Sequence, residues 1–171
     1  MTTAVPAVRN AVRTWLENYE AGDTVLVAVS GGADSLALAH ALSVESKEFV
    51  ITVVGVRVDH QLQENSSVQA EKVKNQLKEF GLDCIIEKVV VDLKDGLEAS
   101  ARKARYDALQ EVAKEKNAIA VFLGHTRDDQ AETVLLGLAR GSGTRSLSGM
   151  AHHNGLYLRP LLEITREQNE Q

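Results

Sequence analysis

Cysteine is nearly absent from this chain of 171 residues, which holds a single thiol at Cys84. One thiol excludes an intramolecular disulfide framework, a cysteine-rich zinc module and an iron–sulfur cluster bound by the chain's own thiolates. Long apolar runs are absent too, since none approaches the roughly 18–20 residues that span a bilayer. The N-terminal segment carries charges throughout, unlike a secretory signal. We therefore expect a soluble, cytoplasmic protein with no membrane partner.

Basic residues are few for a protein that would bind nucleic acid. The 19 lysines and arginines are outnumbered by 24 aspartates and glutamates, which gives a net charge of −5. Phosphate contacts need Lys and Arg, so RNA binding would depend on a local basic face. The length and the apolar content of 44% are those of one globular domain. We therefore expect a single domain over residues 1–171 that begins with a helix within residues 1–22.

Short apolar runs rich in β-branched residues alternate with segments of helical periodicity. Nearly continuous apolar strands are typical of a parallel sheet with both faces covered. We predict an α/β, doubly wound fold with a mainly parallel, five-stranded sheet and helices on both faces. Ligands of such sheets bind at the carboxyl ends of the strands. The expected strands cover 24–29, 50–58, 84–91, 119–124 and 156–158, and the expected helices cover 4–20, 35–48, 65–80, 97–117 and 127–140.

A glycine pair follows the first expected strand, where residues 30–35 read SGGADS and open a helix. Paired glycines let the backbone approach an anion closely, and a helix N-terminus presents N–H groups to it. The spacing matches neither a Walker A loop nor a dinucleotide fingerprint. The alternative is a tight turn in which Asp34 and Ser35 cap the helix. We predict a phosphate-binding loop formed by Ser30, Gly31, Gly32, Ala33, Asp34 and Ser35.

Polar residues also follow the second and fourth expected strands. Asp59 can accept from a ribose hydroxyl or can simply be a polar strand end. His125, Asp129 and Glu132 share one helix face by their spacing. That face is interpreted as a solvated, acid-rich helix start, a divalent metal site, or a surface that binds a cationic amine and transfers protons. The opposite face, with Ala131, Val134, Leu135 and Leu138, is expected to pack on the sheet.

Arginines gather in two further segments. Arg102 and Arg105 lie on one helix face with Glu98, either as ion-pair support or as a pair facing phosphate. Residues 140–150, RGSGTRSLSGM, contain two arginines and no acid. We interpret them either as a basic loop that binds phosphates or as a surface loop with no ligand.

Several collinear motifs carry a resemblance to a known family. SGGADS is similar to the loop of the PP-loop ATP pyrophosphatases, which split ATP into AMP and pyrophosphate while adenylating a substrate. The whole set resembles the N-terminal catalytic domain of the tRNA(Ile)-lysidine synthetases. The matching segments are VAVSGGADS at 27–35, VDH at 58–60, EASARKARY at 98–106, GHTRDDQAET at 124–133, RGSG at 140–143, GM at 149–150 and RPLLEITRE at 159–167.

The resemblance implies an adenine nucleotide alpha-hydrolase-like fold and a ligase that consumes ATP. It would adenylate the wobble cytidine of tRNA(Ile) with a CAU anticodon and then join free L-lysine to C2, giving lysidine, AMP and pyrophosphate. We expect the C-terminal helical tRNA-binding region of the family to be absent from this sequence. A homodimer is one assembly that the resemblance leaves open. Other PP-loop enzymes that act on another tRNA base or a small substrate, and a non-catalytic ATP-binding module, remain alternatives.

The resemblance also implies roles for individual residues. Asp34 would act through Mg²⁺ on the phosphates of ATP, and Val58, Asp59 and Gly124 would join residues 30–35 in binding the nucleotide. The catalytic set would be Asp34, Arg102, Arg105, His125, Asp129 and Glu132, and the substrate and tRNA contacts would be Asp129, Glu132, Arg140, Ser142, Arg145 and Arg159.

Overall fold

A computed structural model describes residues 4–92, 94, 96–141 and 148–165. Its strands form one sheet in the order β3-β2-β1-β4-β6-β5, parallel except for the antiparallel pair of β5 with β6. The predicted five strands are thus six, because a hairpin at the sheet edge adds β5. Both hairpin strands have two residues, too few to produce a recognisable alternation. The strands are β1 (Thr24–Ala28), β2 (Thr52–Asp59), β3 (Asp83–Lys88), β4 (Ala120–Phe122), β5 (His153–Asn154) and β6 (Tyr157–Leu158).

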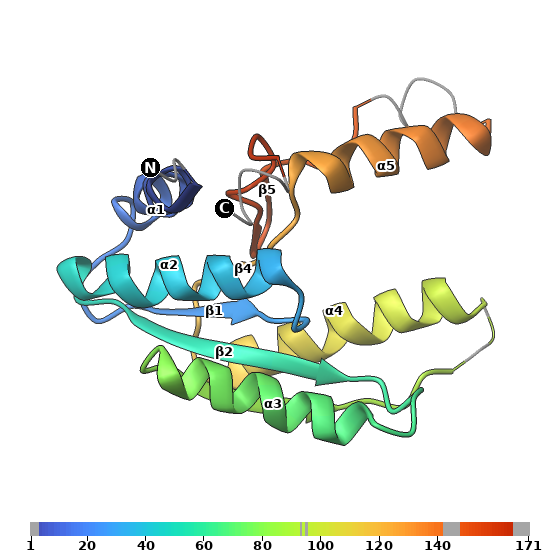
Figure 1. Cartoon of the computed structure of the whole chain (residues 1–171), viewed down its shortest axis with the longest axis horizontal. Coiled ribbons are helices and arrows are strands. Elements are labelled where there is room, and N and C mark those ends of the chain that lie inside the picture. Colours follow the sequence, from blue (N-terminus) through green and yellow to red (C-terminus); the bar gives the residue numbers. More distant parts are fainter. Residues whose placement is uncertain (1–3, 93, 95, 142–147, 166–171) are drawn as a thin grey trace.

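Helices cover both faces of the sheet, as predicted (Figure 1). Buried residues of the first three helices share one hydrophobic cluster with the strands, and buried residues of α4 share a second cluster on the other face. Within the described residues, no helix combines the length and the apolar character that a membrane span needs. The helices are α1 (Ala4–Leu16), α2 (Ala33–Phe49), α3 (Ser66–Glu79), α4 (Leu97–Glu115) and α5 (Arg127–Ala139).

The two clusters arise from the alternation of side chains along each strand. In β2, Val53 belongs to the cluster beneath α1, α2 and α3, whereas Val54 belongs to the cluster beneath α4. Because successive strand residues point to opposite faces, a sheet covered on both sides needs apolar residues at both positions. The consecutive valines of this strand meet that need and predict burial on both faces.

The fifth helix departs from the prediction that it packs on the sheet. None of its described residues is buried, and Leu135 is 65% exposed. Figure 1 shows α5 projecting away from the layer that α2 forms over the sheet. The apolar stripe of Ala131, Val134, Leu135 and Leu138 therefore does not contribute to either core. The direction in which the chain leaves β4 decides this, and helical periodicity carries no information about it.

A buried carboxylate ties the first two helices together. Glu45 of α2 is 3% exposed and accepts hydrogen bonds from Arg9 and Arg13 of α1, at 2.5 and 2.9 Å. Arg13 also pairs with the exposed Glu48. Removing one partner of a buried ion pair leaves an uncompensated charge, so these arginines hold α1 against α2 in one register.

The end of α2 stores backbone strain that a substitution can release. Val50 caps the helix with φ +57° and is 67% exposed. A β-branched residue is disfavoured in this left-handed region, which glycine adopts freely. We predict that Val50→Gly raises the free energy of unfolding by about 1 kcal/mol in urea titrations. The control is Val68→Gly, an equally exposed site (67%) inside α3. This control should lower stability, and a loss at Val50 as well would contradict the prediction.

Candidate functional site

The sheet brings the predicted polar segments to one edge. β1 lies between β2 and β4 and is parallel to both. Their carboxyl ends therefore meet, and each is followed by one of the segments that begin at Ser30, Asp59 and Gly124. The expectation that these three segments lie together is met by the strand order.

The loop after β1 leaves the start of α2 open to an anion. Gly32 is the N-cap residue and has no side chain with which to cap the helix, and its N–H donates to Ser30 Oγ at 3.4 Å. Ser35 instead donates through its hydroxyl to the carbonyl of Gly32 at 3.0 Å, and its Oγ accepts from the Ser30 N–H at 3.2 Å. Gly31 has φ +93°, which favours glycine. Ser35 thus holds the turn through its hydroxyl, and a helix start with glycine at the N-cap has the form of an anion site.

Gly124 lets the end of β4 approach this loop. A Cβ built on Gly124 would lie 3.0 Å from Ser35 Cα and 3.1 Å from Ser35 N. Both atoms belong to the backbone, which cannot shift easily to make room for a side chain. The glycine that opens the segment after β4 is therefore needed for the close packing of two parts of the site.

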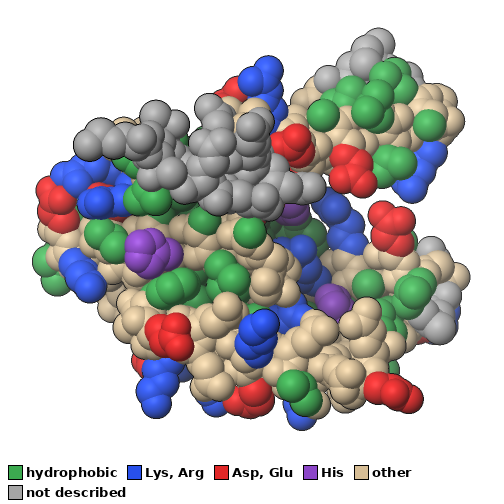
Figure 2. All heavy atoms as spheres, viewed as in Figure 1, with side chains coloured by type: hydrophobic (Ala, Val, Ile, Leu, Met, Phe, Trp, Pro, Cys, Tyr) green, Lys and Arg blue, Asp and Glu red, His purple; other side chains and the backbone are tan. Residues whose placement is uncertain are grey.

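Four arginines gather beside the loop without an acidic partner. They are Arg57 of β2, Arg102 and Arg105 of α4, and Arg159 after β6. Burial lowers the pKa of Arg105, and repulsion by the other three arginines lowers it further. Across the described part of the chain, no ion pair includes any of the four. Figure 2 shows Lys or Arg and His side chains on the floor of a hollow between the α4 and α5 lobes. This acidic protein therefore has a local basic site.

Two small cavities open among these residues. One of about 180 Å³ is lined by the ends of β1 and β2 together with Arg57, His60 and Arg105. A second of about 290 Å³ lies beside the start of α3 and is lined by Arg57, Asp59 and His60, among others. Asp59 is 1% exposed and accepts from the Gln61 N–H through Oδ1 at 3.0 Å, whereas Oδ2 has no hydrogen-bond partner in the described structure. A buried acceptor of this kind is suited to a ligand hydroxyl or amine.

The two histidines of the site are held neutral. Burial, followed by the charges of Arg105 and Arg159, lowers the pKa of His125 from 6.5 to about 4. Burial also lowers the pKa of His60, with Arg105 and Arg57 adding to the effect. The Nδ1 atoms of both rings are buried and make no hydrogen bond within the described structure. Both rings are therefore neutral near neutral pH, and the low pKa of His125 makes it a weak base there.

The acidic residues of α5 differ in what they contact. The Asp129 carboxylate accepts from the Thr126 N–H at 2.7 Å and from the Thr126 hydroxyl at 3.0 Å, forming a capping box. Glu132 is exposed. Among the described residues, no group of three His, Cys, Asp or Glu could hold a metal ion. A metal site formed by His125, Asp129 and Glu132 is therefore not supported. The interpretation as an acid-rich helix start is supported for Asp129, which caps α5.

Arg159 lies behind the site surface. It is 5% exposed and donates to the Ala151 carbonyl at 3.1 Å and to the Tyr106 hydroxyl at 3.2 Å. The guanidinium of Arg102 lies 5.4 Å from the centre of the Tyr106 ring. Arg159 thus positions α4 against the segment before β6, and its burial does not fit a direct contact with a large substrate. Arg140 is exposed at the end of α5, and Ser142 and Arg145 lie outside the described residues.

Sequence reasoning missed Arg57 and the partners of Arg159. A signal for Arg57 was available, because it is the one charged residue within the apolar run VITVVGVRV at 50–58. A charge in a strand covered on both faces requires a polar partner or ligand. No comparable signal pointed to Tyr106, whose contact with Arg159 joins residues 53 positions apart.

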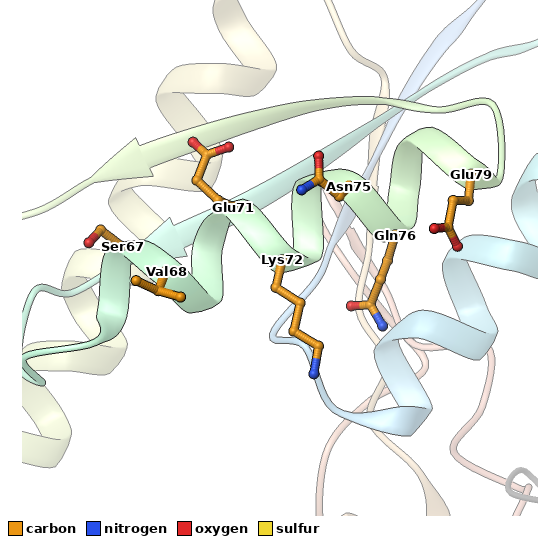
Figure 3. A pocket seen from close by; sticks show the side chains of 7 residues that line it. All are labelled: Ser67, Val68, Glu71, Lys72, Asn75, Gln76 and Glu79. Atoms are coloured by element: carbon orange, nitrogen blue, oxygen red, sulfur yellow. The ribbon is translucent and has the colours of Figure 1, made fainter.

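A further depression, of about 660 Å³, is unrelated to this edge. All of its lining residues belong to α3, between Ser67 and Glu79. Figure 3 shows their side chains spread along one helix, with no second element supplying a lining residue. A ligand site normally draws convergent groups from several elements, so the basic edge of the sheet is the better candidate.

Comparisons with known proteins identify relatives of this chain. The tRNA(Ile)-lysidine synthase of Thermobifida fusca is 52% identical over 163 residues, covering 95% of this chain and 50% of that protein. The Streptomyces coelicolor enzyme of the same name is 56% identical over 147 residues, covering 84% of this chain and 42% of that protein. The chain therefore spans about half the length of the curated relatives it matches.

A solved structure shares the fold. The U34-tRNA thiolase NcsA of Methanococcus maripaludis, determined with its 4Fe-4S cluster, superposes with a TM-score of 0.80 at 19% identity, over 96% of this chain and 60% of that one. At this identity the likeness shows the fold alone. The family model described as PP-loop domain matches residues 6–171. This chain belongs to the PP-loop domain family, and that membership implies that it binds ATP.

Proposed function

We propose that this chain is the ATP-dependent catalytic domain of a tRNA(Ile)-lysidine synthase. The observation that carries the proposal is the juxtaposition of an uncapped phosphate loop with unpaired arginines and an acid-bearing helix at one sheet edge. Identities of 52% and 56% to synthases of this name support the substrate assignment. The substrates are ATP, free L-lysine and the tRNA(Ile) that bears a CAU anticodon.

The first step is adenylation of the tRNA. The C2 oxygen of the wobble cytidine attacks the α-phosphorus of ATP, and the bond to pyrophosphate breaks. The N–H groups at the start of α2 receive the phosphates, and Asp34 would hold a Mg²⁺ ion that offsets their charge. Arg102 and Arg105 offset the negative charge that grows on the transferring phosphoryl group. The unpaired target base can leave the anticodon loop without losing a base-pair partner.

The second step joins lysine to the activated base. The side-chain amine of lysine attacks C2, and AMP leaves with the former C2 oxygen. Asp129 and Glu132 hold the lysine ammonium, and one of these carboxylates or His125 accepts the proton that the ammonium must lose before it attacks. Arg140, Ser142 and Arg145 contact the tRNA. Arg159, buried against Tyr106, supports the arginines of α4 from behind.

The direct test is ATP-dependent lysine incorporation. The chain is mixed with Mg²⁺-ATP, labelled L-lysine and an unmodified tRNA(Ile) transcript, and label in the RNA is counted. We expect incorporation that requires ATP and is lost when the wobble cytidine of the transcript is replaced by uridine. Pyrophosphate release without labelled RNA would instead favour another PP-loop substrate. ATP binding with no turnover, repeated with a longer chain that includes the rest of the protein, would favour a non-catalytic module.

The acids of α5 provide a second test. We predict that Glu132→Gln and Asp129→Asn each raise the KM for lysine roughly tenfold or more, because each loses a charge-assisted contact with the ammonium. Both variants should keep tRNA-dependent pyrophosphate release, since adenylation precedes lysine attack. Asp129→Asn also keeps an acceptor for the Thr126 cap. Asp128→Asn is the control with the same change of charge on the same turn. An unchanged lysine KM in both test variants would refute the assignment.

The pKa of His125 predicts how acid affects stability. Unfolded His125 binds a proton below about pH 6.5, whereas the folded protein resists protonation until about pH 4. The unfolded state therefore binds more protons in this window, and stability falls as the pH drops through it. We predict that His125→Gln loses less stability than the wild type between pH 6.5 and 4, by up to about 3 kcal/mol, in urea titrations. Identical pH dependence in both proteins would show that His125 is protonated normally.

A further inference from the structure

The phosphate loop contains no cation of its own. Residues 30–35 read SGGADS, whereas a Walker A loop carries a lysine that reaches the phosphates. Backbone N–H groups and the α2 dipole supply only partial charges to a polyanion. A full positive charge must therefore come from another element, and the strand beside β1 contains a candidate.

Arg57 of β2 contacts the loop directly. Its Nη1 donates to the carbonyl oxygen of Ser30 at 2.6 Å. The strand register supports this contact, since Ala28 pairs with Val56 and the Val29 N–H donates to the Val56 carbonyl at 2.9 Å. The guanidinium is thus held against the first residue of the loop by a short side-chain bond and by the ladder beneath it.

One nitrogen of the guanidinium has no partner among the described residues. Its Nε is buried and makes no hydrogen bond in the described structure. Arg57 lines both cavities at the strand ends, and its charge adds to that of Arg105 nearby. Leaving a buried N–H donor unsatisfied is costly, and so is placing a half-buried charge beside a like charge. An anion in this place would remove both costs.

We propose that Arg57 is the cation of the phosphate loop, holding Ser30 in place while it draws the phosphates of ATP toward the start of α2. This inference rests on the ATP binding in the proposed function and adds a residue to it. A guanidinium suits both tasks, because its five donors can serve the Ser30 carbonyl and a phosphate oxygen at once. A lysine has the charge but not the planar fork.

Nucleotide binding measured by calorimetry tests the role of Arg57. Mg²⁺-ATP and Mg²⁺-pyrophosphate are titrated into each protein, and adenosine is titrated as a ligand that lacks phosphate. We expect Arg57→Gln to weaken ATP and pyrophosphate binding by about 10- to 100-fold and to change adenosine binding less than about twofold. Lys78→Gln, at an exposed position in the last turn of α3, removes the same charge and should change nothing.

The outcomes separate this inference from the function on which it rests. Unchanged ATP binding in Arg57→Gln, or an equal loss for ATP and adenosine, would overturn the role of Arg57 while leaving ATP binding intact. Failure of the wild type to bind ATP would overturn both. If circular dichroism shows that Arg57→Gln does not fold, the same titrations are made with Arg57→Lys. It should weaken ATP about fivefold with adenosine unchanged, and wild-type affinity for ATP would refute the proposal.

Discussion

The parallel register of β1 with β2 and β4 is the constraint on which the site depends. Parallel pairing sends all three carboxyl ends to one edge, so segments 30–35, 59–63 and 124–132 meet although they are far apart in the chain. Each segment begins where a buried strand stops and its backbone needs new partners. Gly124 allows the closest of these approaches, against the backbone of Ser35. The site is therefore a consequence of strand order and of small residues at the strand ends.

Charge is distributed so that an acidic protein can bind acidic ligands. Arginines of α1 pair with carboxylates such as Glu45, whereas the arginines at the strand ends have no acidic partner in the described structure. The same arginines, together with burial, keep His125 neutral. The same positive field that would favour a bound phosphate therefore also disfavours protonation of a nearby imidazole.

Stability and function occupy different parts of the molecule. The two cores lie beneath α1 to α4, and the polar edge contains an uncapped helix start, buried orphan atoms and mutually repelling arginines. A bound polyanion would relieve the N–H groups of the helix start and the repulsion among the arginines. Helix α5 extends the same contrast, since it carries candidate substrate contacts and buries none of its described side chains.

The sequence by itself predicted the five described helices, five of the six described strands, the glycine-rich loop after β1 and the polar segments at the strand ends, because strand burial, helix periodicity and glycine placement are local patterns. It also predicted the family. Only the tertiary structure decided that Arg57 reaches Ser30, that Arg159 is buried against Tyr106, that Asp129 caps α5 and that the apolar stripe of α5 faces outward. Such contacts depend on the direction in which each element leaves the sheet and on residues distant in the chain, and short-range periodicity contains neither.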